Sequence, residues 1–369
     1  MAKRPDVLVI GAGIFGLWTA LCCARAGMQV ICVDRDQPGA GASGGLVGAL
    51  TPHMPVRWRP LKQFQFDALM SLGEATDRLT EESGLPTGYV QSGRLSPLVD
   101  QRARDRAEEH VHDARTHWQD LACFEVLENS PATLRGFLPQ ESCPNGLVHD
   151  TVSGRVSPRL YIAALAEAVR KKADLRCGCE ILSIDGALGT ATSTQEAFSA
   201  GMIVVASGWR SPSLAGTRPG KGVKGQAALL QAEAPNNMPV IQMPHLYIVQ
   251  QPGGTVAIGS TSEPDWTHAE PDQALEDVIS RARTLCPSLA NAPVIERWSG
   301  IRPKPPGREP TIGRVPGTHR LYLASGGYKI GLGIGHRVGE VIASDLAGSP
   351  SACPFPDDFR PEMPEDIRP

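Results

Sequence analysis

The first long apolar run of the chain covers residues 7–24 and contains no charged side chain. Two basic residues precede it, so it has the outline of a membrane anchor or an uncleaved signal peptide. A membrane span needs about 20 consecutive apolar residues, and a signal peptide needs a small-residue cleavage site. The run is barely long enough for the first, and no such cleavage site follows it.

The residues after the run favour a third interpretation. The segment MQVICVD, residues 28–34, is a short β-branched run that ends in an acid. Strand 6–10, a glycine turn, helix 14–26 and strand 29–33 together make a βαβ unit of the usual length, about 30 residues. The sequence therefore predicts a buried strand and a buried helix in place of a membrane span.

Apolar positions at helical spacing predict further helices along the chain. Their expected ranges are residues 61–83, 102–121, 158–172, 272–285 and 335–346. In the second of them the repeating positions are Ala107, Val111, Ala114, Trp118 and Leu121. Its remaining positions mix both signs of charge with three histidines, which is typical of a solvated face.

Runs of β-branched and apolar residues predict the strands. Residues 178–186 and 320–327 are expected strands, and residues 201–208 are wholly apolar, as in a strand buried on both faces of a parallel sheet. From residue 222 to 260, short runs alternate with turns, which indicates an antiparallel sheet.

The order of these elements predicts an α/β chain in which one domain interrupts the other. A dinucleotide-binding domain is expected over residues 1–85, 145–220 and 312–348, and a substrate domain over 86–144 and 221–311. Residues 349–369 hold six prolines and predict an extended or disordered tail.

Composition narrows the class of protein. The chain has 369 residues and a net charge of −3, from 36 basic and 39 acidic side chains. This balance argues against broad binding to nucleic acid or acidic lipid. Nine scattered cysteines without a CxxC pair suggest reduced thiols in a cytoplasmic protein and no metal site. The oligomeric state is left open.

Three glycines in the first turn carry the clearest chemical signal. Gly11 allows a tight turn, Gly13 allows backbone to approach a pyrophosphate, and Gly16 allows close packing of helix and strand. Asp34 follows Gly16 by 18 residues, at the end of the second strand, where an acid can accept from a ribose hydroxyl. A loop of small residues, 38–53, comes next and offers the Ser43 hydroxyl. A dinucleotide is expected here, and spacing alone leaves both NAD and FAD open.

Motifs along the chain resemble those of one family. The N-terminal fingerprint, GASGG, GRVSP before a helix, GMIVVASGW and IRPKPPGREPTIG with LYLASGGYKIGLGIGH occur in that order. The chain is similar to the D-amino acid oxidase superfamily of flavoproteins, nearest to glycine oxidase and the sarcosine oxidase group. The resemblance implies FAD bound to a Rossmann-type, glutathione-reductase-like domain, with an interleaved substrate domain built on an antiparallel sheet.

The resemblance also implies which residues hold FAD. The loop after the acid would lie along the phosphates and flavin, and SGGYKIGLG would wrap the flavin ring. The expected cofactor contacts are Gly11, Gly13, Ile14, Phe15, Gly16, Asp34, Arg35, Ser43, Gly44, Ile181, Ala206, Gly208, Gly327, Lys329, Gly331 and Leu332.

On the substrate side, the resemblance implies a fixed cation for an amino-acid carboxylate. Arg302 resembles the arginine that relatives use, and Lys329 stands where relatives have a residue assisting the same group. An ordinary surface ion pair is the alternative for both. Tyr247 and Tyr328 are candidate walls or hydroxyl donors, with a core or sheet-face position as the alternative.

Three departures from the family limit what can be carried over. Ala257 stands where sarcosine oxidases have an oxygen-promoting lysine beside the flavin. Residues 304–310 lack the cysteine that tethers flavin in those enzymes, so FAD is expected to be non-covalent. Gly327 stands where glycine oxidases usually have a histidine.

The predicted function is FAD-dependent oxidation of the C–N bond of a small amino acid, such as glycine, an N-methyl glycine or a D-amino acid. Hydride transfer to flavin N5 would give an imine that hydrolyses to a 2-oxo acid, and oxygen or another carrier would accept the electrons. The alternatives are a 2-hydroxy acid dehydrogenase, a non-catalytic FAD-carrying subunit and a tRNA-modifying oxidase. Net charge and length argue against the last.

Overall fold

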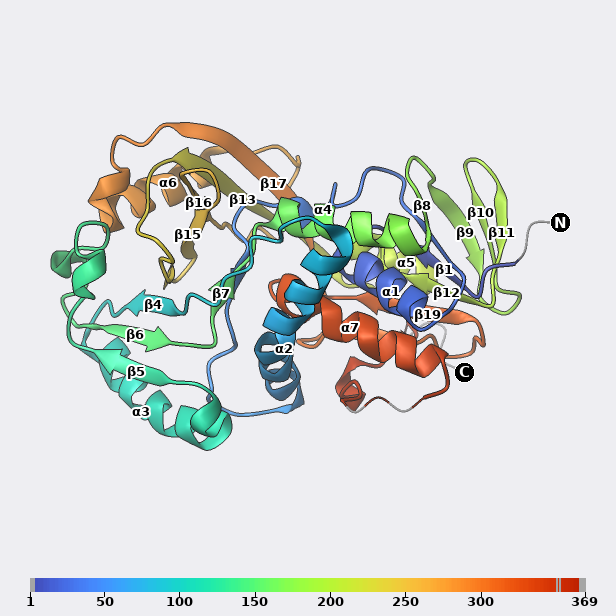
Figure 1. The fold of residues 1–369 in the computed structure, drawn as a ribbon, viewed down its shortest axis with the longest axis horizontal. Helices are drawn as coiled ribbons and strands as arrows, with labels where there is room; N and C mark the ends of the chain where they lie inside the picture. The colour runs from blue at the N-terminus through green and yellow to red at the C-terminus, as the bar shows by residue number, and fades with distance from the viewer. Residues whose placement is uncertain (1–3, 350, 352, 365–369) are drawn as a thin grey trace.

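Two large sheets organise the chain in the computed structural model, which describes residues 4–349, 351 and 353–364 (Figure 1). The first sheet has six strands, which are in order β18 (Thr311–Arg314), β19 (Leu321–Ser325), β12 (Met202–Val205), β1 (Val7–Ile10), β2 (Val30–Val33) and β8 (Asp174–Arg176). All neighbours are parallel except β18, which runs antiparallel to β19. This is the predicted Rossmann-type sheet.

The second sheet has eight strands. In order they are β17 (Val294–Lys304), β13 (Lys221–Gln231), β16 (Thr255–Gly259), β15 (Leu246–Gln251), β14 (Val240–Met243), β4 (Arg94–Pro97), β6 (Leu147–Asp150) and β5 (Phe124–Leu127). Only the β14–β4 pair is parallel. The antiparallel region predicted over 222–260 supplies four of these strands, and the other four were not predicted.

Two small sheets complete the strands. They are formed by β9 (Ile181–Asp185), β10 (Thr190–Ser193) and β11 (Ala197–Ser199), and by β3 (Ala49–Leu50) with β7 (Gly154–Arg155). The helices are α1 (Ile14–Arg25), α2 (Pro60–Ser83), α3 (Gln101–Trp118), α4 (Pro158–Lys172), α5 (Ser211–Ala215), α6 (Gln273–Leu285) and α7 (Gly331–Leu346). Helices α1, α2, α4 and α7 pack on one another beside the first sheet, and α6 packs on the second (Figure 1).

The apolar run at the start of the chain is confirmed as a buried strand and helix. All four residues of β1 are buried, as are residues 14–23 of α1. The strand and helix pack between neighbours on both sides, which explains why residues 7–24 carry no charge. In the part of the chain that the structure describes, no helix combines the length and apolar character needed to cross a bilayer.

Two predicted helix boundaries are wrong. Helix α7 begins at Gly331, four residues before the predicted start, because its glycines serve packing as well as turning. A Cβ at Gly339 would lie 2.6 Å from the backbone of Trp18, so the glycine lets α7 lie close against α1. Helix α3 ends at Trp118, and Leu121 beyond it is 65% exposed and not part of the apolar face.

The proline-rich tail was predicted to be extended or disordered, and its described part is instead packed on the domain. Phe359 is fully buried, and its ring lies edge-on to Phe64 of α2 at a centroid distance of 5.3 Å. The Arg218 backbone N–H donates to the Glu362 carbonyl at 2.8 Å. Residues 350, 352 and 365–369 of the predicted tail lie outside the described residues.

The predicted domain boundaries stay a prediction. The described strands show one difference in sheet membership: β6 lies within the segment 145–220 assigned to the dinucleotide-binding domain, yet it pairs with β4 and β5 in the eight-stranded sheet.

A buried histidine, His336, lies between α2 and α7 and is expected to make the fold sensitive to acid. His336 lies with Nε2 3.0 Å from Ser71 Oγ, and burial lowers its pKa from 6.5 to about 3. Between these two pKa values, His336 is protonated in the unfolded chain and neutral in the folded chain. The stability that depends on this group is fully present above pH 6.5 and is lost as the pH falls toward 3.

We expect His336→Gln to reduce this acid sensitivity, because glutamine keeps a hydrogen-bonding side chain and takes up no proton. Thermal unfolding across the acid range should show a smaller fall in Tm for this variant than for the wild type. His112→Gln on the exposed face of α3 controls for the loss of a histidine elsewhere. An equal fall in wild type and His336→Gln would show that His336 is not the group responsible.

Candidate functional site

A cleft of about 980 Å³ is lined by residues from both large sheets and from the loop that follows β2. Most of the predicted site residues lie on its walls. They are Gly11, Gly13, Ile14, Phe15, Asp34, Arg35, Ser43, Ile181, Ala206, Gly208, Tyr247, Arg302, Gly327, Tyr328, Lys329, Gly331 and Leu332. Gly16 and Gly44 were predicted with them and do not line the cleft, because Gly16 faces the β1 turn and Gly44 lines a neighbouring surface hollow.

The glycines of the first turn are required by close backbone contacts. Gly11 has a φ of +111°, and a Cβ there would lie 2.5 Å from the Ala206 carbonyl oxygen. A Cβ at Gly16 would lie 1.8 Å from the Gly11 carbonyl oxygen, which is far inside van der Waals contact. Gly16 thus lets α1 pack against the turn, and it affects the cleft only through the position of that turn.

Asp34 and Ser43 complete this end of the cleft. The Asp34 carboxylate accepts from the backbone N–H of Ala12 at 2.6 Å and of Asp36 at 2.9 Å, and burial raises the pKa of Asp34. The Ser43 hydroxyl accepts from the N–H of Ile14 at 3.0 Å and so binds the first turn of α1. The cleft-facing helix N-terminus, the bare Gly13 and the acid fit a dinucleotide with its phosphates at the helix end.

A second helix N-terminus meets the cleft from the other end of the chain. Gly331 and Leu332 open α7, and both line the cleft. A Cβ at Gly327 would lie 2.7 Å from Phe15 Cζ, so any side chain at this position would displace Phe15. A glycine at this position is therefore explained by packing against Phe15 in the first turn of α1.

A row of four residues across the second sheet lies at the floor of the cleft, and three of them, Tyr247, Ala227 and Trp298, line it. Tyr247 pairs with Gly259, Gly259 with Ala227, and Ala227 with Trp298. Large rings close both ends of the row and small residues leave its middle hollow. Val47 fills that hollow, since a Cβ at Gly259 would lie 2.7 Å from its Cγ2. The row thereby seats the small-residue loop beside the cleft.

Arg302 lies two residue pairs further along the same face, opposite Val223. Gly225 and Gly300 are paired across β13 and β17, and a Cβ at Gly225 would lie 2.1 Å from the Arg302 guanidinium. The guanidinium therefore rests on bare backbone. It donates from Nη1 to the Thr261 carbonyl at 3.0 Å, and among the described residues no carboxylate forms an ion pair with it. Burial lowers the pKa of Arg302, and an arginine keeps its charge regardless.

The two predicted tyrosines are held by hydrogen bonds at their hydroxyls. Tyr328 OH lies 2.9 Å from Ser262 Oγ, and Tyr247 OH accepts from Gln242 Nε2 at 3.2 Å. Gln242 in turn accepts from Arg94 at 2.8 Å. Arg94 belongs to a buried ion pair in which its Nε is 2.6 Å from Asp150. Tyr247 is thus oriented by a chain of partners that begins in the sheet interior.

Lys329 is exposed beside these groups. Its ammonium lies 5.5 Å from the centre of the Tyr328 ring, and it forms no ion pair with any described residue. Neither Arg302 nor Lys329 is therefore engaged in the ordinary surface ion pair that was the alternative for both.

The cleft also contains residues that were not predicted from the sequence. They include Trp209, Trp266, Trp298 and Ser260. Trp298 could have been predicted, because residues 298, 300 and 302 alternate along one strand and so lie on the same face as Arg302. The placement of Ala257 beside the flavin is wrong: Ala257 is fully buried under Leu46 and does not line the cleft.

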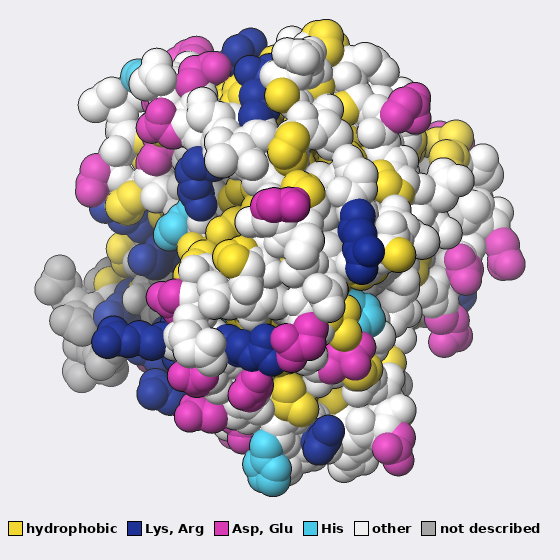
Figure 2. All heavy atoms as spheres, turned by 90° about the vertical axis from the view of Figure 1, so that its left-hand side faces the viewer, with side chains coloured by type: hydrophobic (Ala, Val, Ile, Leu, Met, Phe, Trp, Pro, Cys, Tyr) yellow, Lys and Arg dark blue, Asp and Glu magenta, His cyan; other side chains and the backbone are white. Residues whose placement is uncertain are grey.

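Two further properties concern the rest of the molecule. Across the described residues, no group of three or more His, Cys, Asp or Glu side chains is arranged to hold a metal ion. Figure 2 shows one face of the molecule, where Lys and Arg side chains are interspersed with Asp and Glu.

Comparison with known proteins identifies the family and the fold of this chain. Residues 6–344 match the model of a family described as FAD dependent oxidoreductase (DAO). A glycine oxidase of Bacillus licheniformis is 26% identical over 379 aligned residues, with 100% of both chains covered. A glycine oxidase of Pseudomonas aeruginosa is 29% identical, covering 94% of this chain and 96% of the relative. The crystal structure of glycine oxidase from Geobacillus kaustophilus has the same fold, with a TM-score of 0.87, 23% identity and 100% coverage of both chains.

Proposed function

This chain belongs to the DAO family of FAD-dependent oxidoreductases, and from that premise we propose that it oxidises the C–N bond of a small amino acid. One observation carries the proposal: Arg302 lies in the cleft that contains the dinucleotide turn, with no carboxylate partner among the described residues. A desolvated guanidinium without a counter-ion favours an anionic ligand, and its planar fork suits a carboxylate. The similarity to glycine oxidases supports an amino acid as the molecule that carries this carboxylate.

In this proposal, FAD is held by the glycine turn between β1 and α1, by Asp34, by the small-residue loop and by the start of α7. When bound, FAD supplies the acceptor for a hydride from the carbon next to the amine nitrogen. Two helix N-termini reach the cleft, those of α1 and α7, and both favour negative charge nearby. We infer non-covalent binding, because residues 304–310 contain no cysteine.

The substrate-side residues act by orientation. Arg302 would bind the carboxylate, which fixes the amine-bearing carbon relative to the cofactor. Tyr247 and Tyr328 would close the pocket and exclude water, and Lys329 at the exposed edge would add attraction for the anion. No general base is required, provided that the pocket binds the amine in its neutral form. The oxidised product is an imine, which water converts to a 2-oxo acid and ammonia or a primary amine.

The proposed reaction is tested by its product. The purified holoprotein is incubated with glycine, N-methyl glycine, small D-amino acids and the matching 2-hydroxy acids, and 2-oxo acid is quantified with released amine. Amine release in step with 2-oxo acid is expected. Formation of 2-oxo acid from hydroxy acids alone would replace the proposal with a hydroxy acid dehydrogenase.

Non-covalent binding predicts that acid precipitation releases the flavin. The yellow colour should move to the supernatant and leave a colourless pellet, as measured by absorbance of both fractions. Flavin that stays with the pellet would show a covalent link.

A further inference from the structure

The end of strand β16 contains a bulge next to the candidate site. Regular pairing of β13 with β16 stops at Ala227 and Gly259, and the backbones pair again at Lys224 and Glu263 through hydrogen bonds of 3.0 and 2.9 Å. Two residues of β13 lie between these pairs, and three residues of the other strand, 260–262, lie opposite them. One residue is therefore extra, which is the definition of a β-bulge, and bulges often re-aim side chains beside active sites.

All three bulge residues touch the candidate site. Ser260 lines the cleft, the Thr261 carbonyl accepts from Arg302 at 3.0 Å, and the Ser262 hydroxyl lies 2.9 Å from Tyr328 OH. Arg302 and Tyr328, two of the predicted substrate-binding groups, come from separate segments of the chain, and both contact residues 260–262.

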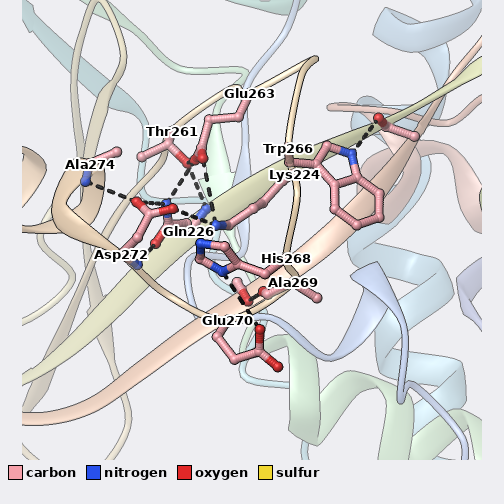
Figure 3. Close-up of polar contacts among 12 residues, drawn as sticks. Lys224, Gln226, Thr261, Glu263, Trp266, His268, Ala269, Glu270, Asp272 and Ala274 are labelled. Carbon is pink, nitrogen blue, oxygen red and sulfur yellow. Dashed lines mark hydrogen bonds and ion pairs between the residues drawn. The ribbon is translucent and has the colours of Figure 1, made fainter.

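The hydroxyl of Thr261 fixes the bulge to the sheet. It accepts from the buried N–H of Gln226 at 2.9 Å, which replaces the ladder bond that the extra residue interrupts. The same hydroxyl donates to the Glu263 carboxylate (Figure 3). The Thr261 hydroxyl therefore uses its donor and one acceptor position, and both bonds go to residues that do not line the cleft.

A charge network stands behind this hydroxyl, with Lys224 and Gln226 buried and the Glu263 and Asp272 side chains 23% and 31% exposed (Figure 3). Gln226 Nε2 donates to Glu263 at 2.9 Å and to Asp272 at 2.7 Å. The Lys224 side chain is 1% exposed, with Nζ 2.6 Å from Asp272 and 3.7 Å from Glu263. Lys224 lies on the face of β13 opposite the Arg302 guanidinium, because alternate residues of a strand point to opposite faces. The network therefore holds the bulge from behind without entering the cleft.

We propose that Thr261 is a positioning residue that, clamped by Lys224, Gln226, Glu263 and Asp272, holds Arg302 and Tyr328 in the geometry that binds the substrate carboxylate. This inference rests on the proposed function of Arg302. Its consequence is that a side chain with no atom directed at the substrate controls affinity for carboxylates. Chemistry after binding depends on FAD and on the cleft walls, so the turnover rate should change much less.

Thr261→Val tests the proposal, because valine keeps the size and β-branching of threonine and removes both hydrogen bonds. The readouts are the dissociation constant of acetate, followed through the flavin absorption spectrum of the holoprotein, and KM and kcat for the best amino acid. We expect both the acetate dissociation constant and KM to rise about tenfold, because a displaced bulge would move the Thr261 carbonyl and Ser262 that position Arg302 and Tyr328. The value of kcat should stay within about twofold, and Thr261→Ser should restore binding.

Two further variants keep the result interpretable. Thr76→Val removes a buried hydroxyl from the interior of α2 and should change Tm without changing acetate binding. If Thr261→Val does not fold, Asp272→Asn weakens the clamp by removing the charge that pairs with Lys224, keeps a side-chain oxygen for the cap of α6, and should shift acetate binding in the same direction.

The acetate measurement separates this inference from the proposed reaction. Wild-type protein that binds acetate and oxidises no amino acid would refute the reaction, and the variants would still decide the role of Thr261. A Thr261→Val protein with lower Tm and unchanged acetate binding would reduce Thr261 to a structural residue and overturn the inference. Wild-type protein that does not bind acetate would overturn it too.

Discussion

Replacing Arg302 by alanine is expected to lower kcat/KM for an amino acid by roughly 100- to 1000-fold, mainly through KM. Loss of one partner from a desolvated, hydrogen-bonded charge pair costs about 2–5 kcal/mol, and each 1.4 kcal/mol is a factor of ten. The guanidinium rests on Gly225 and has no ion-pair partner among the described residues, so little of that loss can be offset by freeing a protein carboxylate. Steady-state kinetics on the holoprotein measure the change.

Arg297→Ala is the matched control for this prediction. Arg297 belongs to the same strand, points to the opposite face and forms an exposed ion pair with Glu276. Exposed pairs of this kind contribute about 0–1 kcal/mol, so its removal should leave kinetics nearly unchanged. Equal kinetics for the two variants would refute the role of Arg302. Arg302→Lys should recover part of the loss, since a point charge replaces a planar fork.

Replacing Gly16 by alanine is expected to abolish most of the flavin content. In an exposed helix, alanine would be favoured over glycine by about 1 kcal/mol. Here the added Cβ would lie 1.8 Å from the Gly11 carbonyl oxygen, which is backbone and has no rotamer to escape into. The helix and the turn must separate, and this displaces the amides that hold the phosphates. We expect affinity for FAD to fall by roughly 100-fold or more, in the range of strong overpacking.

Gly136→Ala provides the comparison for Gly16. A Cβ at Gly136 would meet no atom within 4 Å, so the substitution adds the same methyl group without a clash. The flavin-to-protein ratio and Tm should match the wild type in that variant. A Gly16→Ala protein that binds FAD normally would show that the turn tolerates separation from the helix and that the packing argument is wrong.

The part of the fold that sequence could predict is the part set by local pattern. The uncharged run and the glycine turn specify β1 and α1 within about 20 residues. Strands β4, β5 and β6 were missed because each has only four residues and none is a continuous apolar run. The start of α7 was missed because glycines in a sequence usually indicate a turn, and these glycines permit close contact with α1.

The candidate site, too, was predicted only where single segments of the sequence carry the signal. The positions of Arg302, Tyr328 and the cofactor turn followed from motifs carried by single segments. Their mutual support did not, because the Thr261 bulge exists only once β16 is in register with β13, where the partner Gln226 is 35 residues away in the sequence. Ala257 was misplaced for the same reason: which residue of a strand faces a ligand depends on the loop that covers it, here through Leu46.

The central claim, that this protein oxidises an amino acid anchored at Arg302, is tested most directly by anaerobic titration of the holoprotein. Amino acids and matching hydroxy acids are added while the flavin absorbance is recorded for wild type and Arg302→Ala. The account predicts bleaching by at least one small amino acid, with the half-saturating concentration raised at least 100-fold in Arg302→Ala. A flavin that no amino acid bleaches, or that bleaches equally well in both proteins, would contradict it.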